Sequence, residues 1–329
     1  MLTDSFGRVA TDLRVSLTDR CNLRCAYCMP PEGLDWLPGP SQLTDDELAR
    51  LLSIAVTRLG IAEIRFTGGE PLLRRGLPAI VARAAALRPR PEISITTNGI
   101  GLARLARPLR EAGLDRLNVS LDTLSRATFA TLARRDRLPD VLAGLAAAAA
   151  AGLIPVKVNA VLMRGINDHE APALLRFCLD HGYQLRFIEQ MPLDAQHGWR
   201  REEMITADEI LTALSARFTL IPADPVSRGS APAETFLVNG GPATVGIIAS
   251  VTRPFCGACD RVRLTADGQI RNCLFARSEN DLRTPLQAGA DDDHLGTIWR
   301  RAVAAKLPGH GINDPGFLQP ARPMSAIGG

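Results

Sequence analysis

Alternating apolar and polar residues recur in short stretches along the first two thirds of the chain, with helical patterns between them. The strand-like stretches cover residues 13–17, 61–67, 92–97, 114–120, 154–162 and 184–190. One intervening helical pattern opens with Thr44 and Glu47, a capping-box pair. Repeated β–α units of this kind predict an α/β fold with a parallel sheet, open or closed into a barrel. Six units are fewer than the eight of a complete barrel.

Polar residues occupy alternate positions within these strands, whereas a buried parallel strand normally reads as a nearly continuous apolar run. Period two places each pair on one face, and helices must cover the outer face, so the polar face is expected to line the lumen. A cationic lumen leaves buried charges unpaired unless a large anionic ligand fills it. The alternative is that these positions are strand ends wetted by solvent. The residues are Arg14 and Ser16, Arg65 and Thr67, Ser94 and Thr96, Asn118 and Ser120, Lys157 and Asn159, and Arg186.

A second region begins after a helix expected near 206–216. Prolines and small residues between 222 and 232 mark a loop-rich joint. Beyond it the pattern predicts short strands, a hairpin around residues 266–268 and helices near 294–306.

Composition narrows the class of protein. The 38 basic and 35 acidic residues nearly balance, which gives no support for a nucleic-acid-binding surface. Residues 1–14 carry no secretory signal, and the longest apolar run, 141–156, is too short and too interrupted for a membrane span. We therefore expect a cytoplasmic protein. Only Lys157 and Lys306 are lysines, so a lysine within a predicted strand is notable.

Seven cysteines form two groups of three and one single residue. The odd count and the missing export signal argue against a disulfide framework. Cys178 lies in a helical stretch and is expected to be a core residue.

The first group, Cys21, Cys25 and Cys28, follows the first strand, where barrel active sites form. Three thiolates can hold a [4Fe–4S] cluster and leave one iron open, to which S-adenosylmethionine (SAM) can bind. The alternative is a structural zinc site, but no histidine lies nearby in sequence. This spacing resembles the signature of the radical SAM superfamily. Tyr27 and the glycine-rich segment Thr67–Pro71 fit the same pattern.

The second group, Cys256, Cys259 and Cys273, brackets the predicted hairpin. A zinc ribbon is a more serious alternative here, although residues 254–280 hold no fourth Cys or His. Three ligands again favour a cluster with an open iron, this one free for a substrate atom. Arg261 and Arg263 would share one face of an extended segment, which suits contacts with phosphate or a purine.

Taken together, these motifs resemble the GTP 3′,8-cyclase family, also called molybdenum cofactor biosynthesis protein A. The resemblance covers nearly the whole chain, and the paired cysteine groups with the terminal Gly-Gly make it specific. It is carried by Asp4-Ser-Phe-Gly-Arg8, Thr18-Asp-Arg-Cys21, Arg65-Phe-Thr-Gly-Gly-Glu-Pro71, Asn118-Val-Ser-Leu-Asp122, Lys157-Val-Asn159, Phe255-Cys-Gly-Ala-Cys-Asp-Arg-Val-Arg263 and Met324-Ser-Ala-Ile-Gly-Gly329. Asp260 stands where relatives often have Asn.

The resemblance implies an incomplete (β/α)6 TIM-type barrel over residues 1–222 and a smaller C-terminal α+β domain over 223–329. It implies two [4Fe–4S] clusters, one on each group of cysteines. The implied SAM contacts are Tyr27, Gly69, Ser120 and Met191. The implied GTP contacts are Arg14, Arg65, Thr96 and Lys157, with Arg261 and Arg263 beside the guanine. Gly328 and Gly329 would enter the active site, although a terminal Gly-Gly is usually a frayed end.

The implied reaction converts GTP to 3′,8-cyclo-7,8-dihydro-GTP through a 5′-deoxyadenosyl radical that takes hydrogen from ribose C3′. An electron donor and a downstream cyclic pyranopterin synthase are the implied partners, and a homodimer is compatible with the family. Two alternatives remain at this point. One is a two-cluster radical SAM maturase that modifies peptides, and the other is a non-catalytic zinc or iron–sulfur module.

Overall fold

The computed structural model describes residues 1–224 and 228–328. Residues 225–227, which belong to the loop-rich joint expected between 222 and 232, and Gly329 lie outside the described residues.

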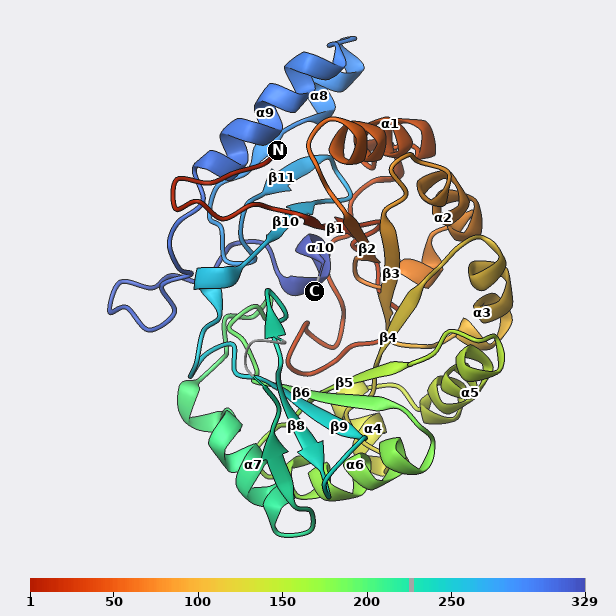
Figure 1. Cartoon of the computed structure of the whole chain (residues 1–329), viewed down its shortest axis with the longest axis vertical. Coiled ribbons are helices and arrows are strands. Elements are labelled where there is room, and N and C mark those ends of the chain that lie inside the picture. The colour runs from red at the N-terminus through yellow and green to blue at the C-terminus, as the bar shows by residue number, and fades with distance from the viewer. Residues whose placement is uncertain (225–227, 329) are drawn as a thin grey trace.

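The first part of the chain forms six β–α units, as the alternation predicts, and its six strands are neighbours in chain order. All six run parallel. Figure 1 shows the strands as a ring with the helices outside it. The elements are β1 (Asp12–Ser16), α1 (Asp45–Thr57), β2 (Glu63–Thr67), α2 (Leu77–Ala85), β3 (Glu92–Thr97), α3 (Leu102–Glu111), β4 (Arg116–Ser120), α4 (Arg126–Ala133), α5 (Leu138–Ala150), β5 (Lys157–Val161), α6 (Ala171–Asp180) and β6 (Gln184–Ile188).

The rest of the chain extends the same sheet at both edges. Strand β9 pairs parallel with β6, and β10 pairs parallel with β1, so eight parallel strands lie side by side. Antiparallel strands follow at each end, with β12 and β7 outermost. The predicted hairpin is present as β10–β11. The elements are α7 (Ala207–Ser215), β7 (Leu220–Pro222), β8 (Glu234–Val238), β9 (Thr244–Ile248), β10 (Arg261–Leu264), β11 (Gln269–Arg271), β12 (Asn280–Asp281), α8 (Arg283–Gln287), α9 (Asp292–Ala304) and α10 (Met324–Ile327).

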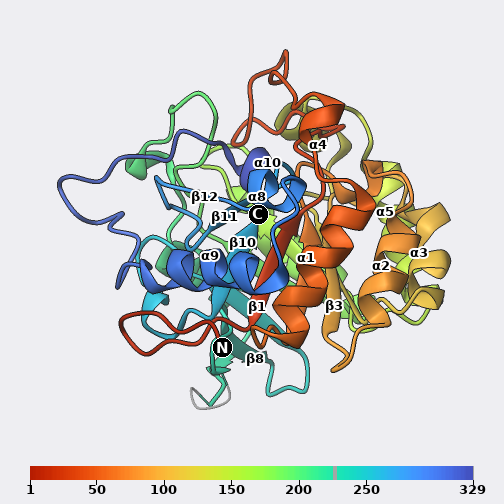
Figure 2. The ribbon, with the colours of Figure 1, turned by 90° about the horizontal axis from the view of Figure 1, so that it is seen from above.

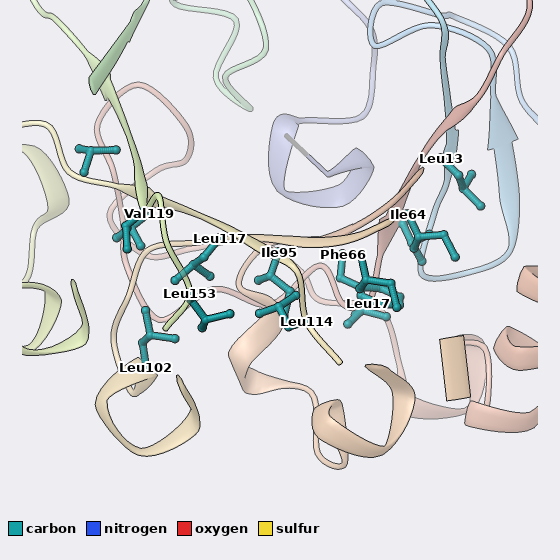
Figure 3. Packing of buried hydrophobic residues seen from close by; sticks show 14 of the residues in the cluster. Leu13, Leu17, Ile64, Phe66, Ile95, Leu102, Leu114, Leu117, Val119 and Leu153 are labelled. Carbon is teal, nitrogen blue, oxygen red and sulfur yellow. The ribbon is translucent and has the colours of Figure 1, made fainter. Parts of the chain in front are cut away.

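The main apolar core lies between the strands and the outer helices. In Figure 3, Leu13, Ile64, Phe66 and Ile95 point from the strands toward the helices and away from the C-terminal tail. All four side chains are fully buried. Each buried side chain of this size contributes about 1.5–3 kcal/mol by leaving water. Cys178 is also fully buried, which confirms its expected place in the core.

Local sequence signals fix the helix ends. Thr44 accepts a hydrogen bond from the Glu47 backbone N–H at 3.2 Å, and Glu47 accepts one from the Thr44 N–H at 2.8 Å, which confirms the capping box. Thr206 and Glu209 form a second capping box at the start of α7. No helix in the described part of the chain is both long and apolar enough to cross a membrane.

The last segments return to the barrel. Helix α9 lies beside α1 (Figure 2), where Arg50 and Asp292 form an ion pair of 2.9 Å. The short helix α10 lies inside the ring of strands (Figure 1). Residues 324–327 are thus held at the centre of the barrel.

Candidate active site

A cavity of about 620 Å³ lies within the ring of strands. Every one of the eight parallel strands contributes to its lining, and so do the loops that follow β1, β2 and β6. A volume of this size is typical of a site that encloses a small-molecule ligand.

The strand register gathers cations on the cavity wall. Arg14 on β1 lies opposite Arg65 on β2 and opposite Arg263 on β10, so three arginines stand side by side across three parallel strands. Lys157 and Arg186 add charge from β5 and β6, and all five residues line the cavity. The period-two pattern therefore marks the lumen face, as predicted, and not solvated strand ends.

Arg14 forms an ion pair of 3.3 Å with Asp12, whereas the other four cations have no ion pair among the described residues. Burial, together with the nearby Arg186, lowers the pKa of Lys157 to about 8. Burial and the adjacent Arg14 lower the pKa of Arg65 well below its usual value. The Nε atoms of Arg65 and Arg186 have no hydrogen-bond partner among residues 1–224 and 228–328. Cations that lack sufficient counter-charge in a cavity fit a ligand that carries several negative charges.

Carboxylates occupy the row two residues nearer the amino ends of the strands than Arg14 and Arg65. Asp12, Glu63 and Glu92 occupy one register row across β1, β2 and β3. Arg116 pairs with Glu63 at 2.9 Å and also contacts Glu92. Near the amino ends of the strands the charges of the cavity wall are therefore paired, whereas the middle of the wall is cationic.

The first cysteine group lies on the loop that follows β1. Cys21, Cys25 and Cys28 all line the cavity. Burial, followed by Asp122 and the other two thiols, raises the pKa of Cys25 well above its ordinary value. Burial also raises the pKa of Cys28 to about 12. Thiols grouped in this way release their protons when they bind metal, which makes the group suitable for an iron–sulfur cluster.

Neighbouring loops hold this group in place. The Tyr27 hydroxyl donates a hydrogen bond of 2.7 Å to Asp122 in the loop after β4. Burial raises the pKa of Asp122 to about 6, although Val161 N–H also donates to this carboxyl. A Cβ at Gly69 would lie 2.3 Å from the backbone oxygens of Asp19 and Arg20, so only glycine allows the loop after β2 to pack against the cysteine loop.

Glu70 ties the glycine-rich loop to the next strand. Its carboxylate accepts hydrogen bonds from Thr97 Oγ1 at 2.6 Å and from Asn98 N–H at 2.7 Å. The side chain is 1% exposed, and burial raises its pKa to about 7. The segment Thr67–Pro71 is therefore a fixed part of the cavity wall.

The second cysteine group lines a smaller pocket of about 90 Å³ that adjoins the cavity. Cys256 and Cys259 lie at a single 3-10 turn before β10, and Cys273 follows β11. Arg261, Arg263 and Met191 line both spaces, so the two are neighbours. Among the described residues, no three His, Cys, Asp or Glu side chains are grouped so as to hold a single metal ion.

His310 lies in the same pocket, although it is remote in sequence. Its Nε2 is 3.1 Å from the Ser250 carbonyl, and its Nδ1 is 3.1 Å from the Ile312 N–H. Both ring nitrogens are thus engaged by backbone groups, so His310 is not free to complete a zinc site with the three cysteines.

Two cations that the sequence did not single out for this site hold the second group. Lys306 Nζ lies 3.3 Å from Cys259 Sγ, and the Lys306 side chain is buried. Arg8, from the N-terminal motif, donates to the Cys256 carbonyl at 2.7 Å. Burial opposes the thiolate of Cys259, but Lys306 and Arg261 outweigh this effect and lower its pKa.

The C-terminal tail reaches both parts of the site. Arg263 donates a hydrogen bond to the Gly328 carbonyl. Gly328 has φ +77°, and a Cβ there would lie 2.6 Å from Thr67 Cγ2, so glycine is required. The Ser325 backbone hydrogen-bonds Cys28 and opposes the rise in that thiol's pKa. Gly329, the other expected tail residue, lies outside the described residues.

The cavity collects the residues that the sequence singled out. Among the expected ligand contacts, the lining includes Tyr27, Gly69, Ser120, Met191, Arg14, Arg65, Thr96, Lys157, Arg261 and Arg263. Their individual roles stay predictions. Arg186 was visible in the alternating pattern without a role, and Arg116 and Asp122 were missed. Arg116 begins the strand whose later residues gave the pattern, and it could have been found by extending that pattern two positions backward.

Both halves of the chain match known protein families. The sequence model of the radical SAM superfamily matches residues 15–178, and that of the Molybdenum Cofactor Synthesis C family matches residues 183–312. The GTP 3′,8-cyclase of Streptomyces coelicolor is 67% identical over 329 residues, which span 100% of this chain and 96% of that protein. The GTP 3′,8-cyclase of Mycobacterium sp. (strain KMS) is 67% identical over 328 residues, spanning 100% and 93% of the two chains.

Solved structures share the fold at low identity. Streptococcus suis SuiB bound to S-adenosylmethionine superposes with a TM-score of 0.61 at 14% identity, over 89% of this chain and 68% of that one. A structure of anSMEcpe with bound AdoMet gives 0.59 at 13% identity, over 92% and 82%. These similarities extend over most of the chain and support the α/β architecture described above.

Proposed function

Because the chain belongs to the GTP 3′,8-cyclases, the radical SAM enzymes of the first step in molybdenum cofactor biosynthesis, we propose that its two cysteine groups hold two [4Fe–4S] clusters that flank one GTP site. The first cluster would bind SAM, and the second would face the guanine.

One observation supports this arrangement above all. Cys21 follows the carboxyl end of β1, whereas Cys259 precedes the amino end of its parallel neighbour β10. The two groups therefore approach one pair of strands from opposite ends. Arg14 and Arg263, which are partners in the register, lie between them. A nucleotide held by these arginines would have one cluster on each side.

The first half of the site suits SAM. Tyr27, Gly69, Ser120 and Met191 all line the cavity that the first cysteine group also lines. The bound group supplies a 5′-deoxyadenosyl radical when one electron is added. The protein would hold SAM over the ribose and exclude water. The cavity wall around Tyr27 and Glu70 suits this role because hydrogen bonds to Asp122 and from Thr97 fix these two side chains.

The cationic middle of the cavity suits the triphosphate. Arg14, Arg65 and Lys157 would bind phosphate oxygens, Arg186 would join them from β6, and Thr96 would add a hydroxyl. The sequence contains no G-x-x-x-x-G-K-[ST] motif, so these side chains replace a P-loop.

The remaining roles follow from position. Arg261 and Arg263 line both the cavity and the pocket of the second group, so they would contact the guanine beside that cluster. C3′ of the ribose would then face SAM while C8 of the guanine lies within reach of C3′. Gly328, held by Arg263, would keep the tail packed against this site, and Gly329 would extend it.

Lys157 makes GTP binding dependent on pH. Its pKa of about 8 in the free protein should rise when phosphate binds, because an anion favours the charged amine. Binding is therefore full below pH 8 and weakens above it, by up to about tenfold per pH unit until the raised pKa is reached. Calorimetry of GTP binding from pH 7 to 9 tests this. Lys157→Arg should remove most of the slope, and an equal slope in that variant would contradict the assignment.

An anaerobic assay tests the proposed function. After reconstitution with iron and sulfide, we expect about eight irons per chain, as two four-iron clusters require. With dithionite, SAM and GTP, 5′-deoxyadenosine should form in step with GTP loss. About four irons would contradict a cluster on the second cysteine group, and SAM cleavage that ignores GTP would favour the peptide-modifying alternative.

The proposal extends to the setting of the enzyme. It would work in the cytoplasm, receive electrons from a separate donor and pass its product to a cyclic pyranopterin synthase. Residues 1–222 would form the barrel unit and 223–329 the unit that carries the second cluster, and a homodimer is compatible with this division.

A further inference from the structure

Four cations, Arg8, Arg261, Arg263 and Lys306, lie near the second cysteine group, and the first two have carboxylate partners. Arg8 pairs with Asp4 at 2.6 Å. Arg261 lies 3.7 Å from an oxygen of Asp12 and 3.9 Å from an oxygen of Asp260. Their charges are therefore compensated within the protein.

Lys306 differs from these two arginines, and also from Arg263, whose side chain donates to the Gly328 carbonyl and not to a cysteine sulfur. It follows α9, its side chain is buried, and no carboxylate forms an ion pair with it in the described ranges 1–224 and 228–328. Its three N–H bonds point to the Cys259 carbonyl at 3.2 Å, the Arg261 carbonyl at 2.9 Å and Cys259 Sγ at 3.3 Å. A buried ammonium needs an anion, and the thiolate is the only anionic group among these three acceptors.

We propose that Lys306 is a positioning residue for the second cluster, which hydrogen-bonds the Cys259 thiolate and supplies the positive charge that favours the reduced state of that cluster. This inference rests on the proposed function, since it takes the second group to hold a cluster. Reduction adds a negative charge to a unit that three thiolates already make anionic. A fixed cation at a ligand sulfur therefore stabilises the reduced form more than the oxidised form.

The test is the reduction potential of the second cluster, measured by EPR-monitored titration. Full-length protein in which Cys21, Cys25 and Cys28 are all replaced by alanine isolates the signal of the second cluster, and the complete enzyme provides the comparison. In Lys306→Met, we expect the reduction equilibrium to become at least about tenfold less favourable, a fall of about 59 mV or more. Arg301→Met, which removes an exposed cation from α9, the helix that Lys306 follows, should leave the potential unchanged.

Two further variants separate charge from structure. Lys306→Arg keeps the charge and should restore most of the potential, whereas Lys306→Gln keeps a donor without the charge and should behave like the methionine variant. Glutamine also serves if the methionine variant does not assemble the cluster. An unchanged potential in both neutral variants, or an equal fall in the arginine variant, would overturn the proposal. If the unsubstituted chain holds only about four irons, the proposed function fails instead, and the two failures are distinguishable.

Discussion

Replacing Cys256 by alanine is expected to abolish GTP cyclisation while leaving SAM cleavage in place. The second group has three thiols, so losing one leaves the cluster with two thiolate ligands. The iron content should fall from about eight to about four per chain. The rate of cyclisation should fall by a factor of about 1,000 or more, since the guanine would lose the group that orients it. Iron analysis and product assays on one preparation measure both effects.

Two other cysteines serve as controls for this result. Cys178→Ala removes a core thiol outside both groups, so the iron content should stay near eight. Cys25→Ala should give the reciprocal loss, with no 5′-deoxyadenosine formed at all. Full cyclisation by the Cys256 variant would show that the second group is not part of the active site.

Arg65→Met is expected to weaken GTP binding by about 100-fold and, at the same time, to stabilise the free protein. The side chain lines the cavity, faces Arg14, and has no hydrogen bond or ion pair within the part of the chain that the structure describes. Removing an unpaired cation from that position should raise the free energy of unfolding by about 1 kcal/mol. Two charge-assisted hydrogen bonds to phosphate account for the loss of affinity.

Arg116→Met is the matched comparison. Arg116 lines the same cavity but pairs with Glu63 and contacts Glu92, so its loss leaves two carboxylates close together and should lower stability. Calorimetry of GTP binding and thermal unfolding in the absence of nucleotide measure both quantities. A destabilised Arg65 variant that still binds GTP normally would contradict a ligand-binding role for this arginine.

The first half of the fold was predictable because its signals are local. Six strands and their helices follow from alternating polarity and from caps such as Thr44 and Glu47. The polar residues in those strands also predicted a cavity, because a parallel strand that packs against apolar layers on both faces consists almost entirely of apolar residues. Arg65 and Lys157 were found in this way.

The second half depends on contacts between distant segments, which no local pattern reveals. Strands β9 and β10 join opposite edges of the barrel, although only 12 residues separate them in the sequence. Arg8 reaches Cys256 across 248 positions, and Lys306 reaches Cys259 across 47. The rarity of lysine in this chain was a signal for Lys306, but it did not indicate which group the side chain would meet.

The most direct test of the proposed GTP site follows the hydrogen atom at C3′ of the ribose. GTP carrying deuterium at C3′ is incubated anaerobically with the reconstituted enzyme, SAM and dithionite, and the 5′-deoxyadenosine is analysed by mass spectrometry. If the cavity holds the ribose against the SAM site as proposed, one deuterium per turnover appears in 5′-deoxyadenosine. If 5′-deoxyadenosine forms without deuterium while GTP is consumed, the radical does not act at C3′, and the proposed placement of GTP between the two cysteine groups is wrong.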